Sequence, residues 1–406
     1  MKKFLKPILY ITVLTLTLAS CKKDNVEDPN ITDYETDIQQ FEAVWNGLNT
    51  AYALWPIDTT DWDAVYEHYR PVFAEMEGQS NRVWDSTWRE LTSSLIDHHL
   101  SIKLERPSTG YKTSIKPGYA EVTHRDYFHS AFISYYQISH FSMLTSMMSS
   151  GRFADVQSDT DVATLFSGVL DDNIAYLYIS SFRGYQLDSK KSFIHFKELV
   201  ARENIKAAII DIRDNGGGYA YNVNYIPSCF RKDSYEIGKS QTKTGLGRYE
   251  LGPKVPYMVG AGISINGVMI KGQDCDIPVV VLANVNTASA SEITAIAIKH
   301  LPQGYVVGER TFGATCALSD DFGLFYSGSF GDSQGFADGI WTGHGHYIYT
   351  PKYLFTGVDG TVYEGHGIDP DVECLFDQAA WNSGIDNQLE CAVNFAKEKI
   401  AENENK

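Results

Sequence analysis

Two serines, Ser289 and Ser291, stand where a continuous apolar run gives way to an alanine-rich segment. Residues 278–283 have the pattern of a buried strand, and residues 288–300 that of a helix. At a helix N-terminus several backbone N–H groups have no partner, and the helix dipole is positive. Such N–H groups can stabilise an alkoxide or an oxyanion. The segment therefore suits a serine nucleophile, and a serine that merely caps the helix is the alternative interpretation.

A glycine triplet, Gly216 to Gly218, follows a second short apolar run at 206–212. Glycine permits positive φ and lets the backbone approach a ligand closely. Successive N–H groups in such a loop can form an anion-binding nest. The spacing is neither GxGxxG nor GxxxxGK[ST], so a phosphate-binding loop is not indicated. A plain tight loop is the alternative.

Candidate proton-transfer groups lie in two further segments. Asp97-His98-His99 offers histidine, the usual general base near neutral pH, although adjacent histidines also occur at surfaces and in polar cores. Glu364 opens a turn, residues 364–371, that Gly and Pro punctuate. Its carboxylate could orient a histidine, and a plain turn is the alternative.

Alternating strands and helices surround these segments. Buried strands followed by helices predict an α/β core with a partly parallel sheet. The expected strands are 173–182, 206–212, 278–283 and 305–308, and the expected helices of this region are 192–203 and 288–300. A further helix is expected at 387–401.

The preceding region, residues 33–105, reads as helical. Phe41, Val44, Leu48 and Tyr52 recur at spacings of three and four, which predicts one apolar helix face. A second helix is expected after a cap at Asp61, and a third at 84–96. Residues 106–165 form a connecting region, in which the aromatic-rich stretch 127–148 fits either a strand or a helix.

The composition excludes several functions. The 406 residues include 34 basic and 51 acidic side chains, a net charge of −17 without a basic run, so nucleic acid is not expected as a partner. The six cysteines form no CxxC or Cys/His cluster, which leaves a metal site unsupported. No cofactor is expected, and the sequence does not indicate an oligomeric state.

The first twenty residues have the pattern of a secretory signal: Lys2, Lys3 and Lys6, then an apolar stretch at 7–18. Leu18-Ala19-Ser20-Cys21 resembles the lipobox of bacterial lipoproteins. We therefore expect cleavage before Cys21 and a lipid on its thiol, which would hold the protein to a membrane of the cell envelope. Without residues 1–20, which hold three lysines, the charge is 31 − 51 = −20.

In combination and in this order, the segments resemble the tail-specific (C-terminal processing) protease and tricorn-core family of serine peptidases. The resemblance covers roughly residues 33–375 and implies an α/β core of the ClpP/crotonase spiral type. Its motifs are Asp97-His98-His99, the loop 211–218, Ser289 to Ile293, Gly308-Glu309-Arg310-Thr311-Phe312-Gly313, and the turn 364–371.

The chain departs from the tail-specific pattern in two ways. The family's lysine base follows the serine by 25 residues, and 314 − 289 = 25 falls here on Ala314. That spacing selects Ser289 over Ser291 as the nucleophile. The second departure is that no PDZ pattern is recognisable before the core.

The resemblance to the lysine-less tricorn branch implies a role for each aligned residue. Ser289 attacks the scissile carbonyl, and His99 takes its proton and later protonates the leaving amine. Glu364 supports the histidine, while the N–H groups of Gly217 and Ala290 form the oxyanion hole. Tricorn has a serine before its histidine, where this chain has His98.

The sequence therefore predicts an exported serine peptidase that acts on peptides or proteins. A catalytically inactive protein that binds a peptide or apolar ligand on the same fold is the alternative, motivated by the missing lysine and the aromatic stretch 127–148. The predicted organisation is a signal peptide at 1–20, a tether at 21–32, a helical domain at 33–105, a connecting region at 106–165, the protease core at 166–378 and a C-terminal helix at 379–406.

Overall fold

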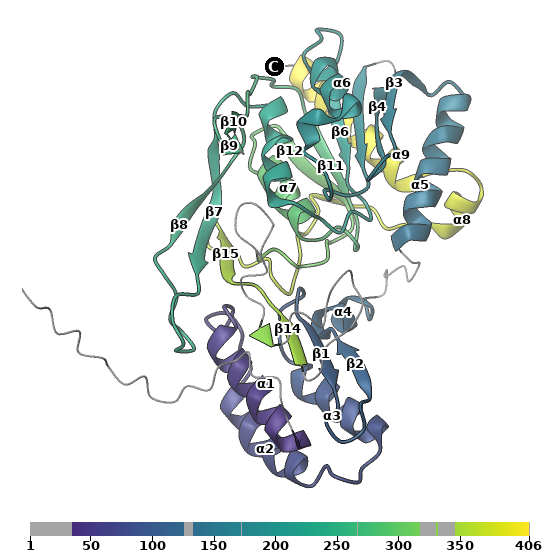
Figure 1. The fold of residues 1–406 in the computed structure, drawn as a ribbon. Helices are drawn as coiled ribbons and strands as arrows, with labels where there is room; N and C mark the ends of the chain where they lie inside the picture. Colours follow the sequence, from purple (N-terminus) through teal and green to yellow (C-terminus); the bar gives the residue numbers. More distant parts are fainter. Residues whose placement is uncertain are drawn as a thin grey trace, which may run out of the picture.

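A computed structural model describes residues 35–125, 133–171, 173–265, 267–316, 330–331 and 346–405. The predicted signal peptide, tether and lipidation at Cys21 lie outside these residues. A larger α/β body holds most of the chain, and a smaller body at the bottom of Figure 1 holds the first three helices. Within the described residues, no helix combines the length and apolar character needed to cross a bilayer.

A seven-stranded sheet forms the centre of the larger body, in the order β16-β12-β11-β6-β5-β4-β3. The five strands from β16 to β5 run parallel, while β4 and β3 are antiparallel to their neighbours. The strands are β3 (Phe153–Asp159), β4 (Leu165–Leu170), β5 (Ile174–Ile179), β6 (Ala207–Asp211), β11 (Val279–Ala283), β12 (Gly304–Gly308) and β16 (Val372–Glu373). Parallel neighbours place the ends of β6, β11 and β12, and the loops that follow them, at one edge of the sheet.

Alternate residues of the central strands belong to two hydrophobic clusters. Ile210 of β6 and Val281 of β11 pack in the cluster that includes α6 (Lys191–Val200) and α7 (Ala290–Lys299). Ile209 and Val280 pack in the cluster that includes α5 (Ile133–Ser149) and α9 (Asn387–Glu404). Because side chains alternate across a strand, both faces of the sheet are covered, which explains the continuously apolar strands.

The smaller body joins helices to a sheet of its own. Its helices are α1 (Asp37–Ala51), α2 (Trp62–Ala74) and α3 (Asn81–Thr92), and Asp61 caps α2 as predicted, since its carboxylate accepts the N–H of Ala64 at 3.0 Å. The four-stranded sheet has the order β13-β14-β1-β2 and is antiparallel. Its strands are β1 (Ser101–Glu105), β2 (Lys112–Ile115), β13 (Phe330–Gly331) and β14 (His346–Tyr349). The pairing of β1 with β14 holds the segment that precedes β1 against the larger body.

A third, three-stranded antiparallel sheet extends from the larger body, in the order β15-β7-β8. Its strands are β7 (Tyr235–Thr242), β8 (Val255–Val259) and β15 (Tyr353–Gly357). Only a short turn separates β14 from β15, so one stretch of chain links the small sheet to this one. The remaining elements are α4 (Pro117–Val122), α8 (Gln378–Asn382), the hairpin strands β9 (Ser264–Ile265) and β10 (Val268–Met269), and the 3₁₀ turns η1 (Leu187–Ser189), η2 (Ala220–Asn224) and η3 (Pro227–Cys229).

The predicted fold class, an α/β core with a helical N-terminal region, is confirmed. The aromatic stretch that the sequence left undecided is helical over α5. The structure adds two features to the predicted organisation: strands β1 and β2 around residue 106, and α9, which packs on the central sheet rather than standing apart from the core.

Candidate active site

Ser289 lies in the turn between β11 and α7, immediately before the first residue of the helix. Its backbone has φ +60° and ψ −126°, a conformation that costs a non-glycine residue about 1–3 kcal/mol and that is enriched at functional sites. The N–H of Ala288 donates to the carbonyl of Asn215 at 3.1 Å, which ties this turn to the glycine loop. The turn therefore holds a half-buried serine at a helix N-terminus, as the sequence predicts.

Glu292, one turn into α7, fixes the position of Ser289. Its fully buried carboxylate accepts the N–H of Ser289 at 3.0 Å. It also accepts the N–H groups of Gly313 and Ala314, both at 2.7 Å, and the hydroxyl of Thr311 at 2.5 Å. Burial raises the pKa of Glu292, and these four donors oppose the shift. The carboxylate thus joins the nucleophile turn to the loop after β12, including the position of the absent lysine.

Ser289 and His99 line one cavity of about 380 Å³. The cavity lies between the glycine loop, the start of α7 and the sheet that contains β7, β8 and β15. Much of the remaining lining is aromatic or aliphatic: Tyr219, Val223, Tyr257, Ile293, Tyr349, Tyr353 and Phe355. Although both residues line this cavity, no hydrogen bond joins the Ser289 hydroxyl to the His99 ring among the described residues.

His99 is half-buried, but both of its ring nitrogens are buried and neither has a hydrogen-bond partner among the described residues. Burial, followed by the proximity of His98, lowers the pKa of His99 to about 3. The imidazole is therefore neutral at physiological pH and has a free lone pair for a proton. A buried imidazole nitrogen without a partner lowers the stability of the fold, so its presence points to a functional role.

Two buried carboxylates accompany this ring. Ligand atoms of Asp97, His99 and Glu364 all lie within 4.8 Å of one another. Burial raises the pKa of Asp97 to about 7, and burial followed by the charge of Asp97 raises the pKa of Glu364. Two close carboxylates cannot both ionise easily, so the pair holds one proton near neutrality. We did not predict Asp97 as a site residue. Its position two residues before His99 is the sequence signal that could have indicated it.

The same three residues are the candidate metal ligands, but donors already occupy the carboxylates. Asp97 accepts the N–H of His99 and the hydroxyl of Thr350, each at 2.8 Å. Glu364 accepts backbone N–H groups from His98 at 3.1 Å and from Thr315 and Cys316 at 2.7 Å. These contacts suit carboxylates that hold a loop and a proton beside a histidine, and we assign no metal to them.

The two predicted oxyanion donors differ in whether their N–H groups already have acceptors. The N–H of Ala290 makes no hydrogen bond to any described residue, as expected for the first residue of a helix. The N–H of Gly217, by contrast, donates to the side-chain oxygen of Asn215 at 2.9 Å. The Gly217 N–H therefore already has an acceptor within the protein, which a substrate oxygen would have to replace. The next N–H, that of Gly218, has no acceptor within the described ranges, and Gly218 lines the cavity.

The two adjacent histidines have different surroundings. The Nδ1 of His98 lies 2.6 Å from the carbonyl oxygen of Phe312, and its Nε2 lies 3.6 Å from a carboxylate oxygen of Glu121. Burial lowers the pKa of His98 to about 4. Of the two, only His99 lines the cavity that contains Ser289.

Known proteins that resemble this chain are peptidases of the C-terminal processing and tricorn types. Residues 173–374 match the model of peptidase family S41. A chloroplastic C-terminal processing peptidase of Tetradesmus obliquus is 32% identical over 158 residues, which are 38% of this chain and 29% of that protein. Tricorn protease homolog 1 of Streptomyces coelicolor is 32% identical over 205 residues, 50% of this chain and 15% of that protein. The chain thus spans less than a third of the length of these curated relatives.

Solved structures share the fold over most of the chain. A crystal structure of a candidate peptidase from Parabacteroides merdae matches with a TM-score of 0.63 and 22% identity, covering 89% of this chain and 97% of the other. A crystal structure of mature CPAF matches with a TM-score of 0.54 and 12% identity, covering 89% and 96% of the two chains. At these identities the similarity supports the fold alone.

Proposed function

Because residues 173–374 match the model of peptidase family S41, we propose that this chain is a serine-type peptidase with Ser289 as its nucleophile and His99 as its general base. One observation carries the proposal. A strained serine at a helix N-terminus and an unpartnered neutral histidine line the same cavity. The substrate class is peptides or proteins, and no cofactor takes part.

In acylation, the Ser289 oxygen bonds to the scissile carbonyl carbon while its proton passes to a ring nitrogen of His99. The tetrahedral intermediate then breaks its C–N bond, and His99 returns the proton to the leaving amine. Water deprotonated by the same imidazole releases the acyl group. A rotamer change that brings the Ser289 hydroxyl to the ring is required, since no hydrogen bond joins them at rest.

The carboxylate pair supports the histidine in this cycle. When His99 accepts a proton, the imidazolium lies beside Asp97 and Glu364, which together carry one negative charge near neutrality. An opposite charge within several ångströms stabilises the protonated ring, so it offsets the burial that disfavours it at rest. We therefore assign Asp97 a positioning role beside the predicted Glu364.

The oxyanion is stabilised by backbone N–H groups, with Ala290 as the first donor. Gly217 supplies the second when a substrate oxygen replaces Asn215 as its acceptor, since Gly217 lies in direct contact with the Ser289 turn. Each such donor contributes roughly 2.7–4 kcal/mol to transition-state stabilisation in characterised enzymes.

The signal-like N-terminal residues are the basis for a proposal about where the protein is located. We propose export and attachment to a cell-envelope membrane through lipid on Cys21, on the basis of the signal-like residues 1–20 alone. Metabolic labelling with a radioactive fatty acid should mark the wild-type protein and not Cys21→Ser. Equal labelling of both proteins would contradict this anchor.

Hydrolysis of a peptide library tests the activity. Ser289→Ala should abolish cleavage, whereas Ser291→Ala should retain it, because Ser291 is fully buried two residues further along the same helix. A wild-type protein that cleaves no peptide, and whose ligand affinity is unchanged in Ser289→Ala, would instead support the alternative of a binding protein on the same fold.

A further inference from the structure

A second cavity, of about 670 Å³, lies apart from Ser289, between the N-terminal body and the loop after β12. Its lining comes from the end of α3, the β2–α4 segment and Arg310. None of the residues that line it also lines the cavity of Ser289 and His99. It is therefore a separate site, in which the proposed chemistry has no part.

The lining is strongly basic in an acidic protein. Its charged side chains are one carboxylate, that of Glu121, and the basic groups of Arg89, Lys116, His124, Arg125 and Arg310. The whole chain carries a charge of −17, so this concentration of basic side chains is a local exception. A concave site lined by one sign of charge attracts ligands of the opposite sign.

The basic side chains of this cavity differ in how many hydrogen bonds and ion pairs they already make. Glu121 pairs with Arg125 at 2.9 Å, and Arg125 also donates to the carbonyl of Thr311 at 2.7 Å, so this guanidinium is engaged. The Lys116 side chain is exposed, and its ammonium has no hydrogen-bond or ion-pair partner within the described residues. Arg89 donates to Asp85 through Nε at 2.8 Å, and its Nη2 donates to Asp85, Thr113 and Ser114. Half of its side chain is exposed, and its Nη1 has no hydrogen-bond partner among the described residues. Lys116 and Arg89 are thus accessible to a ligand.

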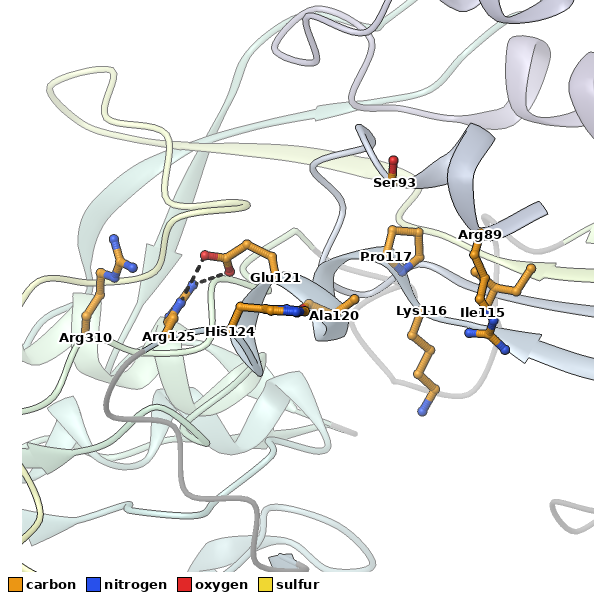
Figure 2. Close-up of a pocket in the computed structure, with 10 residues that line it drawn as sticks. All are labelled: Arg89, Ser93, Ile115, Lys116, Pro117, Ala120, Glu121, His124, Arg125 and Arg310. Carbon is orange, nitrogen blue, oxygen red and sulfur yellow. Dashed lines mark hydrogen bonds and ion pairs between the residues drawn. The ribbon is translucent and has the colours of Figure 1, made fainter. Parts of the chain in front are cut away.

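The basic groups extend along the cavity. Figure 2 shows Arg125 and Arg310 at one end and Lys116 and Arg89 at the other, with Pro117 and Ala120 between them. A single inorganic anion is far too small to reach both ends of this space. An extended ligand with separated negative groups and some apolar surface fits both the length and the mixed lining.

We propose that this cavity is an exosite that binds an acidic segment of the substrate polypeptide, with Asp or Glu carboxylates paired to Lys116 and Arg89. A nucleic acid is disfavoured because its continuous charge would meet the acidic remainder of the protein. The identity of the occupant as substrate rests on the proposed peptidase function; the affinity for acidic peptide does not.

Contacts lead from this cavity to the nucleophile. Arg125 donates to the carbonyl of Thr311, and the Thr311 hydroxyl donates to Glu292, which accepts the N–H of Ser289. An acidic segment bound here therefore lies against the same loop that holds the nucleophile turn, which suits a site for a distal part of the cleaved chain.

Fluorescence anisotropy on the Ser289→Ala protein tests the exosite without cleavage. The probes are a labelled peptide of alternating Glu and Gly residues and the same peptide with Gln in place of Glu. The Glu peptide should bind and weaken as salt is raised, because exposed charges are screened. Lys116→Glu should weaken it by about fivefold, by loss of one pair and gain of one repulsion. Lys254→Glu is the matched control, an exposed lysine outside the cavity.

The exosite would be overturned if the Glu and Gln peptides bound equally well, or if the two lysine variants had equal effects. It would also be overturned if an oligonucleotide competed more strongly than unlabelled Glu peptide. Lys116→Ala gives the same reading if Lys116→Glu fails to fold. Lys116-dependent binding without any hydrolysis by wild type would refute the peptidase alone, and hydrolysis without such binding would refute the exosite alone.

Discussion

A Cβ atom placed on Gly217 would lie 2.7 Å from the Cβ of Ser289. It would also lie 2.8 Å from the carbonyl oxygen of Ala288 and 2.9 Å from the N atom of Ala290, and these backbone atoms cannot move away. The glycine loop and the nucleophile turn thus touch directly. This contact places Gly217 against Ser289 and the N atom of Ala290, the two residues where α7 begins.

Gly217→Ala should reduce kcat by about 100-fold or more while the protein still folds, because the added methyl displaces the turn that presents Ser289 and one oxyanion donor. The control is Gly78→Ala, which has a similar φ of +83° but open space around its Cβ. Both variants bear the backbone strain, so only the steric contact differs. Equal activities of the two variants would contradict the contact's role.

Glu292→Gln should destabilise the protein by about 1–3 kcal/mol and lower activity, because the new amide group faces N–H donors that previously shared a carboxylate. Thermal unfolding and peptide hydrolysis measure the two effects. Glu198→Gln, on the exposed side of α6, makes the same chemical change and should alter neither. A Glu292→Gln protein with wild-type stability would show that the carboxylate is not the link between α7 and the loop after β12.

Activity should rise with pH through about 7. Below that value Asp97 is protonated and offers no negative charge to the His99 imidazolium, whereas above it Asp97 is ionised beside Glu364, whose pKa is also raised by burial. A profile of kcat/KM against pH measures this, and Asp97→Asn should shift or abolish the inflection. Asp369→Asn, which changes an exposed carboxylate that does not line the cavity, should leave the inflection in place. An inflection near pH 7 that persists in Asp97→Asn would assign it to another group.

Stability should fall as the solution becomes acidic. The pKa of His99 is lowered from 6.5 to about 3, so between these values the unfolded chain binds a proton that the native state does not, and the free energy of unfolding decreases. Asp97, with its raised pKa of about 7, acts in the opposite sense. The loss on going from pH 6.5 to 4 should therefore be larger in Asp97→Asn and smaller in His99→Asn than in wild type, in chemical denaturation experiments.

The central strands could be predicted because their residues are apolar on both faces. Val279–Ala283 and Ala207–Asp211 read as continuous apolar runs, and the helix that starts at Ala290 follows the first of them directly. Local composition alone fixes such elements, since a parallel sheet covered on both faces tolerates few polar residues. The stretch over α5 lacked a clear period and could not be decided.

Features that depend on distant parts of the chain could not be read from the sequence. The pairing of Ser101 with Tyr349 brings together segments more than two hundred residues apart, and it places the Asp97–His99 segment beside Glu364. The bond from the Gly217 N–H to Asn215 depends on a side-chain rotamer. The basic cavity likewise draws Arg89 and Arg310 from distant segments.

Fluorophosphonate labelling followed by mass spectrometry tests the central claim most directly, because the reagent reports both the nucleophile and the base that activates it. We expect one adduct on Ser289, none in Ser289→Ala, and labelling slowed by about 100-fold or more in His99→Asn with the fold intact. The His98→Asn variant, altered outside the cavity, should label much faster than His99→Asn. An adduct on another residue, no adduct at all, or an unchanged rate in His99→Asn would contradict the assignment of Ser289 and His99.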